Sequence, residues 1–279
     1  MLPVLLDLKF VKIYTMGLFL VLAFFWASFI LWRLIRLSSF KEEDVFDALF
    51  NSLFAGLIMG RFVYVLLHFK EFGFNILKFI LINGYPGLSL YGTYLGIGLG
   101  LYLWSYLKKI RFSEFIDYYA PSALLAMGIG KLGSFFSGSE VGIKTDFLLS
   151  VKYANMDGMR HLTPLYESMA FFLAAYIAYR FLFEIRKEKI KKGFNLFFVL
   201  WVQGLVYFLF DNMKEHRLYF MNYSFNKVVS GVLLLTFSFY FVYYFRNLLR
   251  GKIRGLTYLT IHHVKRTFKS IHHKTKKSN

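Results

Sequence analysis

The amino-acid sequence predicts an all-α integral membrane protein with about seven transmembrane helices, and three observations lead to this prediction. Hydrophobic residues make up 57% of the 279 residues and aromatic residues 21%, which is more apolar surface than one soluble core of this size normally buries. The apolar residues gather in long runs, and the connections between the runs alternate in their content of basic residues. Lipid is therefore the expected solvent for most of the chain.

Seven runs approach the length that a membrane span requires. A hydrocarbon layer of about 30 Å is crossed by about 20 helical residues. The predominantly apolar runs are 13–32, 45–67, 88–107, 116–137, 165–183, 194–213 and 226–245. The first run is too long for the apolar part of a signal peptide and lacks a small-x-small cleavage pattern, so we expect it to be retained as a span. We expect a transmembrane domain over residues 1–250 and a separate tail over residues 251–279.

The distribution of basic residues predicts the orientation of the helices. The connections 33–44, 108–115, 184–193 and 246–279 contain 21 Lys and Arg residues. The alternate segments 1–12, 68–87, 138–164 and 214–225 contain 9. Because Lys and Arg are retained on the cytoplasmic side, the first set should be cytoplasmic. An odd number of spans then places the N-terminus outside and the C-terminus in the cytoplasm.

The tail is basic and contains no carboxylate side chain after Arg250. We expect its partner to be anionic lipid of the inner leaflet rather than nucleic acid. Apolar residues at Ile261, Val264, Phe268 and Ile271 are spaced as in a short amphipathic surface helix.

The chain contains no cysteine. This excludes disulfides, thiolate metal sites and a cysteine nucleophile, although a substrate can still supply a thiol. We expect neither a cofactor nor a metal ion.

Two cations inside the predicted spans mark a candidate site. A charge near the bilayer centre costs at least about 2.5–3.5 kcal/mol on insertion scales, so it usually faces a polar cavity or a partner. Arg61 in the second run and Lys131 in the fourth should lie at similar depths toward the outer end. Alternatively, Arg61 pairs with Glu167 or Asp211, or extends to the interface.

Further polar residues fall at the same end of the predicted bundle. They are Tyr14 in the first span, Tyr91 in the third, Tyr166 and Glu167 in the fifth, and Tyr207 and Asp211 in the sixth. Two cations with hydroxyls and carboxylates at one depth suit an anionic lipid headgroup, and a phospholipid is the expected ligand. The long outer connection 138–164 carries His161 and is a candidate lid.

Glycines are spaced for close helix packing in two of the runs. Gly92, Gly96 and Gly100 follow at four-residue intervals, and small residues let membrane helices approach one another. Gly128, Gly130 and Gly133 surround Lys131, where they could also leave room for a ligand.

Four segments resemble motifs of the prolipoprotein diacylglyceryl transferase family, in the same order along the chain. They are Gly60-Arg61-Phe62-Val63-Tyr64, Gly87-Leu88-Ser89-Leu90-Tyr91-Gly92, the signature-like stretch from Gly128 to Gly142, and Arg160-His161-Leu162-Thr163-Pro164-Leu165-Tyr166-Glu167. The resemblance covers most of residues 10–245. It implies a seven-span bacterial enzyme of the cytoplasmic membrane that moves diacylglyceryl from phosphatidylglycerol to the lipobox cysteine of preprolipoproteins at the outer face.

The resemblance also implies roles for individual residues. Phosphate would be bound by Arg61 and Lys131, and the headgroup by hydrogen bonds from Tyr14 and Ser134. Tyr91 stands where the family has a histidine, and His161 is a candidate acceptor for the thiol proton. Glu167 and Asp211 would orient the cations. The remaining residues expected to contact substrate are Gly142, Tyr166 and Tyr207.

The chain departs from the family pattern at four positions. Tyr91 replaces the family's histidine, Lys131 its signature arginine, Ser134 its signature asparagine, and Tyr207 an arginine of the sixth span. Two further interpretations stay open. One is a relative that binds phospholipid or a membrane partner without transfer. The other is a small-solute transporter, which is disfavoured because the cations cluster at one end.

Overall fold

The computed structural model describes residues 3–7, 12–81, 84–153, 156–215, 219–220 and 223–246. The basic tail, with its predicted amphipathic helix and lipid partner, lies outside the described residues. Each of the seven predicted apolar runs forms a long helix. These helices are α1 (Thr15–Ile35), α2 (Glu42–Leu67), α5 (Leu90–Leu107), α6 (Phe112–Ser137), α7 (Thr163–Arg186), α8 (Phe194–Phe210) and α9 (Phe225–Tyr244).

The helices give the chain the character of a multi-pass membrane protein. Among the described residues, α1, α2, α7, α8 with the turn after it, and α9 are long and apolar enough to cross a membrane. Helices α5 and α6 fall outside this group of 5, since tyrosine, glycine and serine lower the hydropathy of both. The membrane character is therefore confirmed, and a count of seven spans remains a prediction.

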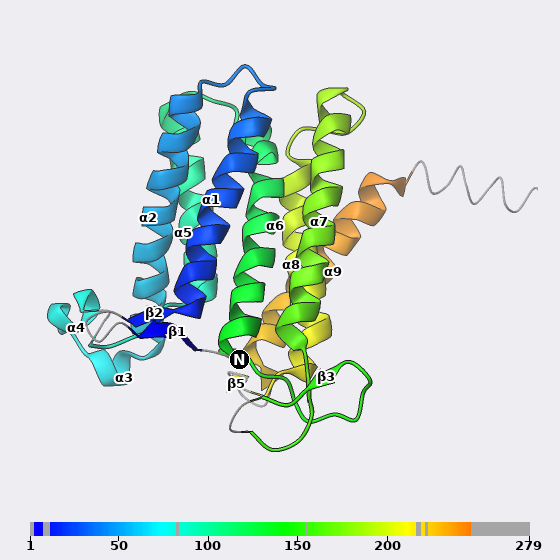
Figure 1. Ribbon diagram of the computed structural model, residues 1–279. Coiled ribbons are helices and arrows are strands. Elements are labelled where there is room, and N and C mark those ends of the chain that lie inside the picture. The colour runs from blue at the N-terminus through cyan, green and yellow to red at the C-terminus, as the bar shows by residue number, and fades with distance from the viewer. Residues whose placement is uncertain are drawn as a thin grey trace, which may run out of the picture.

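Helix α6 lies at the centre of the bundle. It packs along α1 on one side and α7 on the other, while α2 pairs with α5 and α8 pairs with α9 (Figure 1). One apolar core joins α1, α2 and α6 around Leu31, Val45 and Phe115. A second core joins α6, α7 and α8 around Leu124 and Phe171. This arrangement places the C-terminal end of α6 beside the start of α7 and the end of α8.

The short elements lie at one end of the bundle, opposite the connections α1–α2, α5–α6 and α7–α8 (Figure 1). They are the hairpin β1 (Val4–Asp7) and β2 (Lys12–Tyr14), α3 (Phe69–Phe72), α4 (Ile76–Ile80), the pair β3 (Ser150–Val151) and β4 (Arg160–His161), the 3-10 helix η1 (Asp211–Met213), and the pair β5 (Tyr219–Phe220) and β6 (Tyr223–Ser224). All three strand pairs are antiparallel.

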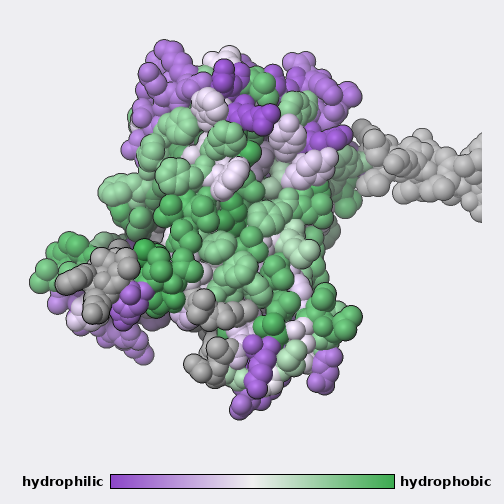
Figure 2. All heavy atoms as spheres, in the orientation of Figure 1, coloured by the Kyte–Doolittle hydropathy of each residue, from purple (hydrophilic) through white to green (hydrophobic). Residues whose placement is uncertain are grey.

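An apolar band crosses the middle of the face that Figure 2 shows, with hydrophilic residues toward both ends. Large apolar side chains of the long helices, such as Phe25, Phe54 and Phe239, are more than half exposed. Because hydrocarbon accepts such side chains at no cost, their exposure agrees with a lipid environment.

Close packing of α5 on α2 confirms the role predicted for the glycine repeat. A Cβ added to Gly96 would lie 2.5 Å from the carbonyl oxygen of Ala55 and 2.7 Å from the Cα of Gly56. A Cβ added to Gly100 would lie 2.8 Å from the Cα of Ser52. The backbones meet so closely that no larger side chain fits.

A buried carboxylate fixes the start of α8 at the end of the bundle that carries the basic connections. Asp117 of α6 accepts hydrogen bonds from the backbone N–H groups of Gly193 (2.6 Å) and Asn195 (3.0 Å). These N–H groups lack partners within the helix, so the contact satisfies them and favours the helix N-terminus. A cavity of about 250 Å³ lies nearby, lined by residues that include Ser38, Asp117 and Arg186.

Candidate functional site

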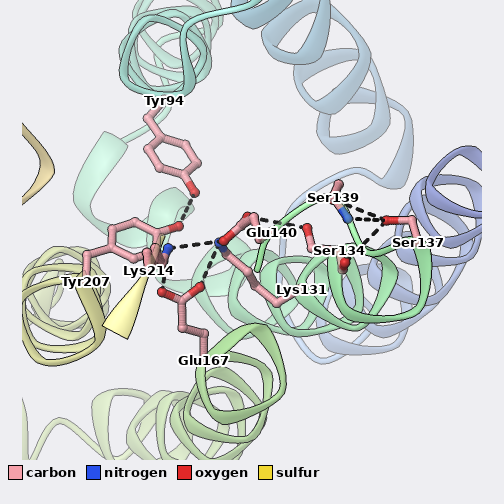
Figure 3. A network of polar contacts seen from close by, with 9 residues as sticks. All are labelled: Tyr94, Lys131, Ser134, Ser137, Ser139, Glu140, Glu167, Tyr207 and Lys214. Carbon is pink, nitrogen blue, oxygen red and sulfur yellow. Dashed lines mark hydrogen bonds and ion pairs between the residues drawn. The ribbon is translucent and has the colours of Figure 1, made fainter. Parts of the chain in front are cut away.

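Two lysines and two glutamates form a closed ring of ion pairs at the end of the bundle that carries the short elements. Lys131 Nζ lies 2.7 Å from Glu140 Oε1 and 2.7 Å from Glu167 Oε2. Lys214 Nζ lies 3.1 Å from Glu140 Oε2 and 2.7 Å from Glu167 Oε1. Each carboxylate therefore bridges both ammonium groups, as Figure 3 shows. We call these four residues the Lys–Glu ring; its formal charge is zero.

The ring of Tyr207 packs against the ammonium groups of both lysines. Both ammonium nitrogens lie 5.4 Å from the ring centroid of Tyr207, on α8. The Tyr207 hydroxyl is 3.1 Å from that of Tyr94, on α5 (Figure 3). An aromatic face attracts a cation, so Tyr207 helps to hold both ammonium groups in place.

The end of α6 explains how Glu140 reaches Lys131. Gly138 caps the helix with φ 72°, a left-handed conformation that favours glycine. The N–H of Ser139 then donates to the carbonyl of Ser134, which turns the chain back along the helix. Ser134 Oγ also approaches Glu140 Oε1 at 3.4 Å. The predicted headgroup ligand Ser134 thus lies beside the Lys–Glu ring.

Lys214 enters the ring because two distant segments pair. The N–H of Ile143 donates to the carbonyl of Met213 at 2.9 Å, and the N–H of Glu215 donates to that of Val141 at 3.0 Å. Gly142 and Lys214 form the bridge between these bonds. The pairing places the lysine directly beside the segment that carries Glu140.

Burial and charge act in opposite directions on Glu140. Burial alone would raise the pKa of its carboxyl group, but the ammonium groups of Lys131 and Lys214 outweigh burial and lower the pKa from 4.5 to about 2. Glu140 is therefore ionised throughout the physiological pH range. Its side chain is 33% exposed, whereas that of Glu167 is 0% exposed.

Gly142 supports the site through its backbone. An added Cβ would collide with the carbonyl oxygen of His161 and would lie 2.9 Å from Thr163 Oγ1. Arg160 donates from the same guanidinium nitrogen to the Gly142 carbonyl (3.1 Å) and to Glu215 (2.6 Å). Glycine is required at this position because the loop passes too close to β4 for a side chain to fit.

The sequence predicted that Arg61 and Lys131 share one site, but the contacts of Arg61 lie elsewhere. Its guanidinium donates to the carbonyls of Lys78 (2.7 Å), Phe79 (2.9 Å) and Gly87 (2.9 Å). Two of these carbonyls belong to the last turn of α4, where a cation is favoured. The described contacts of Arg61 and those of the Lys–Glu ring share no residue. The guanidinium instead joins α2, α4 and the turn before α5.

Tyr91 and Asp211 lie near the ring but outside it. The Tyr91 hydroxyl donates to Asn226 Oδ1 at 2.9 Å, and its ring packs edge-on against Phe225. Tyr91 lies within electrostatic reach of Asp211 and Lys131. Asp211 is 1% exposed, and within the described part of the chain neither of its carboxylate oxygens has a hydrogen-bond partner.

The remaining predicted residues lie around the outer loop. The Tyr166 hydroxyl donates to the carbonyl of Leu149 at 2.6 Å, and its ring centroid is 6.4 Å from that of His161. His161 Nδ1 is buried and has no hydrogen-bond partner in the residues that the structure describes. Tyr14 is 57% exposed at the start of α1. The described contacts of these three residues place none of them in the Lys–Glu ring.

Comparison with known proteins identifies the family. The family model for prolipoprotein diacylglyceryl transferase matches residues 3–243. The chain belongs to the prolipoprotein diacylglyceryl transferase family. It is thus a member of a transferase family of lipoprotein biosynthesis, as the sequence motifs had indicated.

Three curated relatives share about a quarter of their aligned residues with this chain. A phosphatidylglycerol–prolipoprotein diacylglyceryl transferase of Clostridium tetani is 27% identical over 209 residues, covering 73% of this chain and 82% of the relative. The transferase of that name from Finegoldia magna is 24% identical over 73% of this chain and 79% of its own length. That from Listeria monocytogenes is 28% identical, over 70% and 72%.

Sequence reasoning did not assign a role to three residues of the site. Glu140 stands within the stretch compared with the signature of prolipoprotein diacylglyceryl transferases, and the cost of an unpaired Lys131 was a signal that an anion lies near. Tyr94 follows Tyr91 by three residues and so shares its side of α5. Nothing local in the sequence pairs Lys214 with Glu140.

Proposed function

We propose that this protein transfers a diacylglyceryl group from phosphatidylglycerol to the lipobox cysteine thiol of preprolipoproteins at the outer face of the bacterial cytoplasmic membrane. The observation that carries the proposal is the family match over residues 3–243, which spans every residue of the Lys–Glu ring. The curated relatives bear the name of this activity. A pair of ammonium groups at one end of an apolar bundle suits a lipid phosphate whose acyl chains remain in the membrane.

In the proposed reaction the substrate sulfur attacks the carbon of the diacylglyceryl group that is bonded to the phosphate oxygen. The C–S bond forms, the C–O bond breaks, and glycerol phosphate leaves with the bonding electron pair. Lys131 and Lys214 stabilise the charge that develops on the leaving phosphate, which is the principal electrostatic task of such a site. Glu167 and Tyr207 hold these ammonium groups in position.

Other residues are assigned by their place in the sequence motifs and at this end of the bundle. Ser134 hydrogen-bonds the headgroup, and Tyr91 contacts the substrate at the position of the family's histidine. The thiol proton passes to His161 or to the departing phosphate. Asp211, Tyr166 and Gly142 shape the substrate-binding surface. Tyr14 meets the lipid at the interface, and Arg61 acts by positioning the chain between α2 and α5.

Thioether formation tests this proposal directly. Purified protein in phosphatidylcholine nanodiscs is mixed with a lipobox peptide, with and without phosphatidylglycerol, and the peptide mass is measured. Addition of the diacylglyceryl mass only with phosphatidylglycerol is expected. Lys131→Ala should abolish the addition, while Lys108→Ala, which removes an exposed lysine at the other end of the bundle, should leave it unchanged. Absence of addition by folded wild-type protein would contradict transfer.

A second candidate function is phospholipid binding without transfer. The observation that favours it is the pairing of both lysines with carboxylates, together with a tyrosine in place of the family's histidine. In that case wild-type protein binds phosphatidylglycerol but forms no thioether. Turnover that appears only in Tyr91→His would assign the loss to that position.

A further inference from the structure

The two carboxylates of the Lys–Glu ring differ in their freedom to leave it. Glu167 has 0% side-chain exposure and is held at the start of α7, between α6 and α8. Glu140 is 33% exposed and comes from the segment after the end of α6. Only Glu140 therefore has an open side toward which its carboxylate can rotate.

The backbone around Glu140 is fixed, so rotation of the side chain is sufficient. The N–H of Ser139 donates to Ser134, and the carbonyl of Val141 accepts from Glu215. Val141 is also buried, with 5% exposure. A change of Glu140 rotamer would release both ammonium groups from this carboxylate without unpairing the loop, while Glu167 stays paired with both.

The geometry of Glu140 resembles that of a bound phosphate group. Its Oε1 lies 2.7 Å from Lys131 Nζ, and its Oε2 lies 3.1 Å from Lys214 Nζ. Two oxygens of one anion thus bridge the two cations, as two non-ester oxygens of a phosphodiester would. Both anions carry one negative charge, so their exchange conserves the neutrality of the ring.

We propose that Glu140 occupies the phosphate position of the site in the lipid-free protein, and that an anionic phospholipid headgroup binds by displacing it. This inference rests on the proposed function for the location of the lipid, but concerns binding rather than transfer. Glu140 keeps the lysines paired while lipid is absent. It also favours departure of the product, because a glycerol phosphate monoester carries about −1.5 to −2 charges at neutral pH and the returning carboxylate repels it.

The consequence is competition between Glu140 and the headgroup. A glutamine at this position keeps the shape of the side chain but removes its charge, so the lysines bind the headgroup against a weaker competitor. The affinity of folded protein for phosphatidylglycerol should therefore rise when Glu140 is neutralised. If Glu140 serves only to stabilise the loop, the affinity should stay the same or fall.

Equilibrium binding of short-chain phosphatidylglycerol to full-length protein in phosphatidylcholine nanodiscs tests the exchange. Glu140→Gln should lower the Kd by about fivefold to tenfold, because the headgroup no longer competes with the charge-assisted hydrogen bonds from Glu140 to the lysines. The matched control is Asp146→Asn, which removes an exposed negative charge from the same loop and should leave the Kd unchanged. Glu140→Asp keeps the charge but cannot span both lysines, so it should lower the Kd by a smaller factor.

An unchanged or higher Kd in folded Glu140→Gln would overturn the inference. If that variant does not fold, the same result in Glu140→Asp overturns it. Failure of the proposed function looks different, because wild-type protein would then form no thioether while the Kd still fell in Glu140→Gln. Normal thioether formation with an unchanged Kd would overturn the exchange alone.

Discussion

Lys131 is held in the protein by two carboxylates, one of which is inaccessible to solvent. Removal of the ammonium group would leave the 0% exposed Glu167 with Lys214 as its remaining ring partner. Loss of one member of a buried ion pair costs about 3–5 kcal/mol, because the remaining charge stays desolvated. At the scale of single residues, the stability of the site therefore depends on charge balance rather than on any one contact.

Lys131→Met should lower the free energy of unfolding by about 3 kcal/mol. Unfolding followed in mixed detergent micelles provides the measurement. Lys108→Met breaks an exposed pair with Asp44 and should leave the free energy of unfolding almost unchanged. Adding Glu167→Gln to Lys131→Met should recover part of the loss, and purely additive effects of the two substitutions would contradict mutual dependence.

The lowered pKa of Glu140 predicts acid sensitivity. A carboxyl group whose pKa is lower in the folded than in the unfolded state stabilises the fold above its unfolded pKa. That contribution is lost as the pH falls from about 5 toward about 2, because the carboxyl group binds a proton more readily in the unfolded state than in the folded state. The apparent melting temperature of wild-type protein should exceed that of Glu140→Gln at pH 7, and the difference should shrink with falling pH. A difference that does not depend on pH would contradict ionisation of Glu140 as the cause.

At the scale of elements, close backbone approach joins α2 to α5. Gly96→Ala would place a methyl group 2.5 Å from the Ala55 carbonyl oxygen and should cost about 1–3 kcal/mol through forced separation of the helices. Gly98→Ala is the matched control, because nothing lies within 4 Å of its added Cβ. Thermal unfolding should separate the two variants, and equal stability would argue that the helices can move apart without cost.

The positions of the helices could be predicted from the sequence because hydropathy acts locally. Each apolar run contains the information for its own helix, and the α5 glycines signal a close neighbour by their spacing. Glu140 and Lys214 are 74 residues apart and meet only through the pairing of their two loops. Such a contact leaves no periodic pattern in the chain.

The contacts of Arg61 could not be predicted from the sequence either. Its depth in α2 could be estimated by counting residues, and depth alone suggested a partner site with Lys131. The direction of its side chain depends on α4 and the turn at Gly87, whose carbonyls it binds. The placement of short elements between spans follows from tertiary packing rather than from hydropathy.

At the scale of the whole molecule, the ends of the bundle differ in charge and in structure. The basic connections lie at one end, and the Lys–Glu ring and the short elements lie at the other (Figure 1). Retention of Lys and Arg on the cytoplasmic side predicts that the ring faces outward. This orientation is required if the site is to meet substrates at the outer face.

The absence of cysteine makes the orientation directly measurable, because a single introduced thiol is a unique probe. Asp146→Cys places the thiol on an exposed position of the outer loop, and Ser39→Cys places it on the exposed connection between α1 and α2. In spheroplasts, a membrane-impermeant maleimide should label the Asp146→Cys protein at once and the Ser39→Cys protein only after detergent is added. Labelling in the reverse order would place the Lys–Glu ring on the cytoplasmic side, where it could not act on substrates at the outer face.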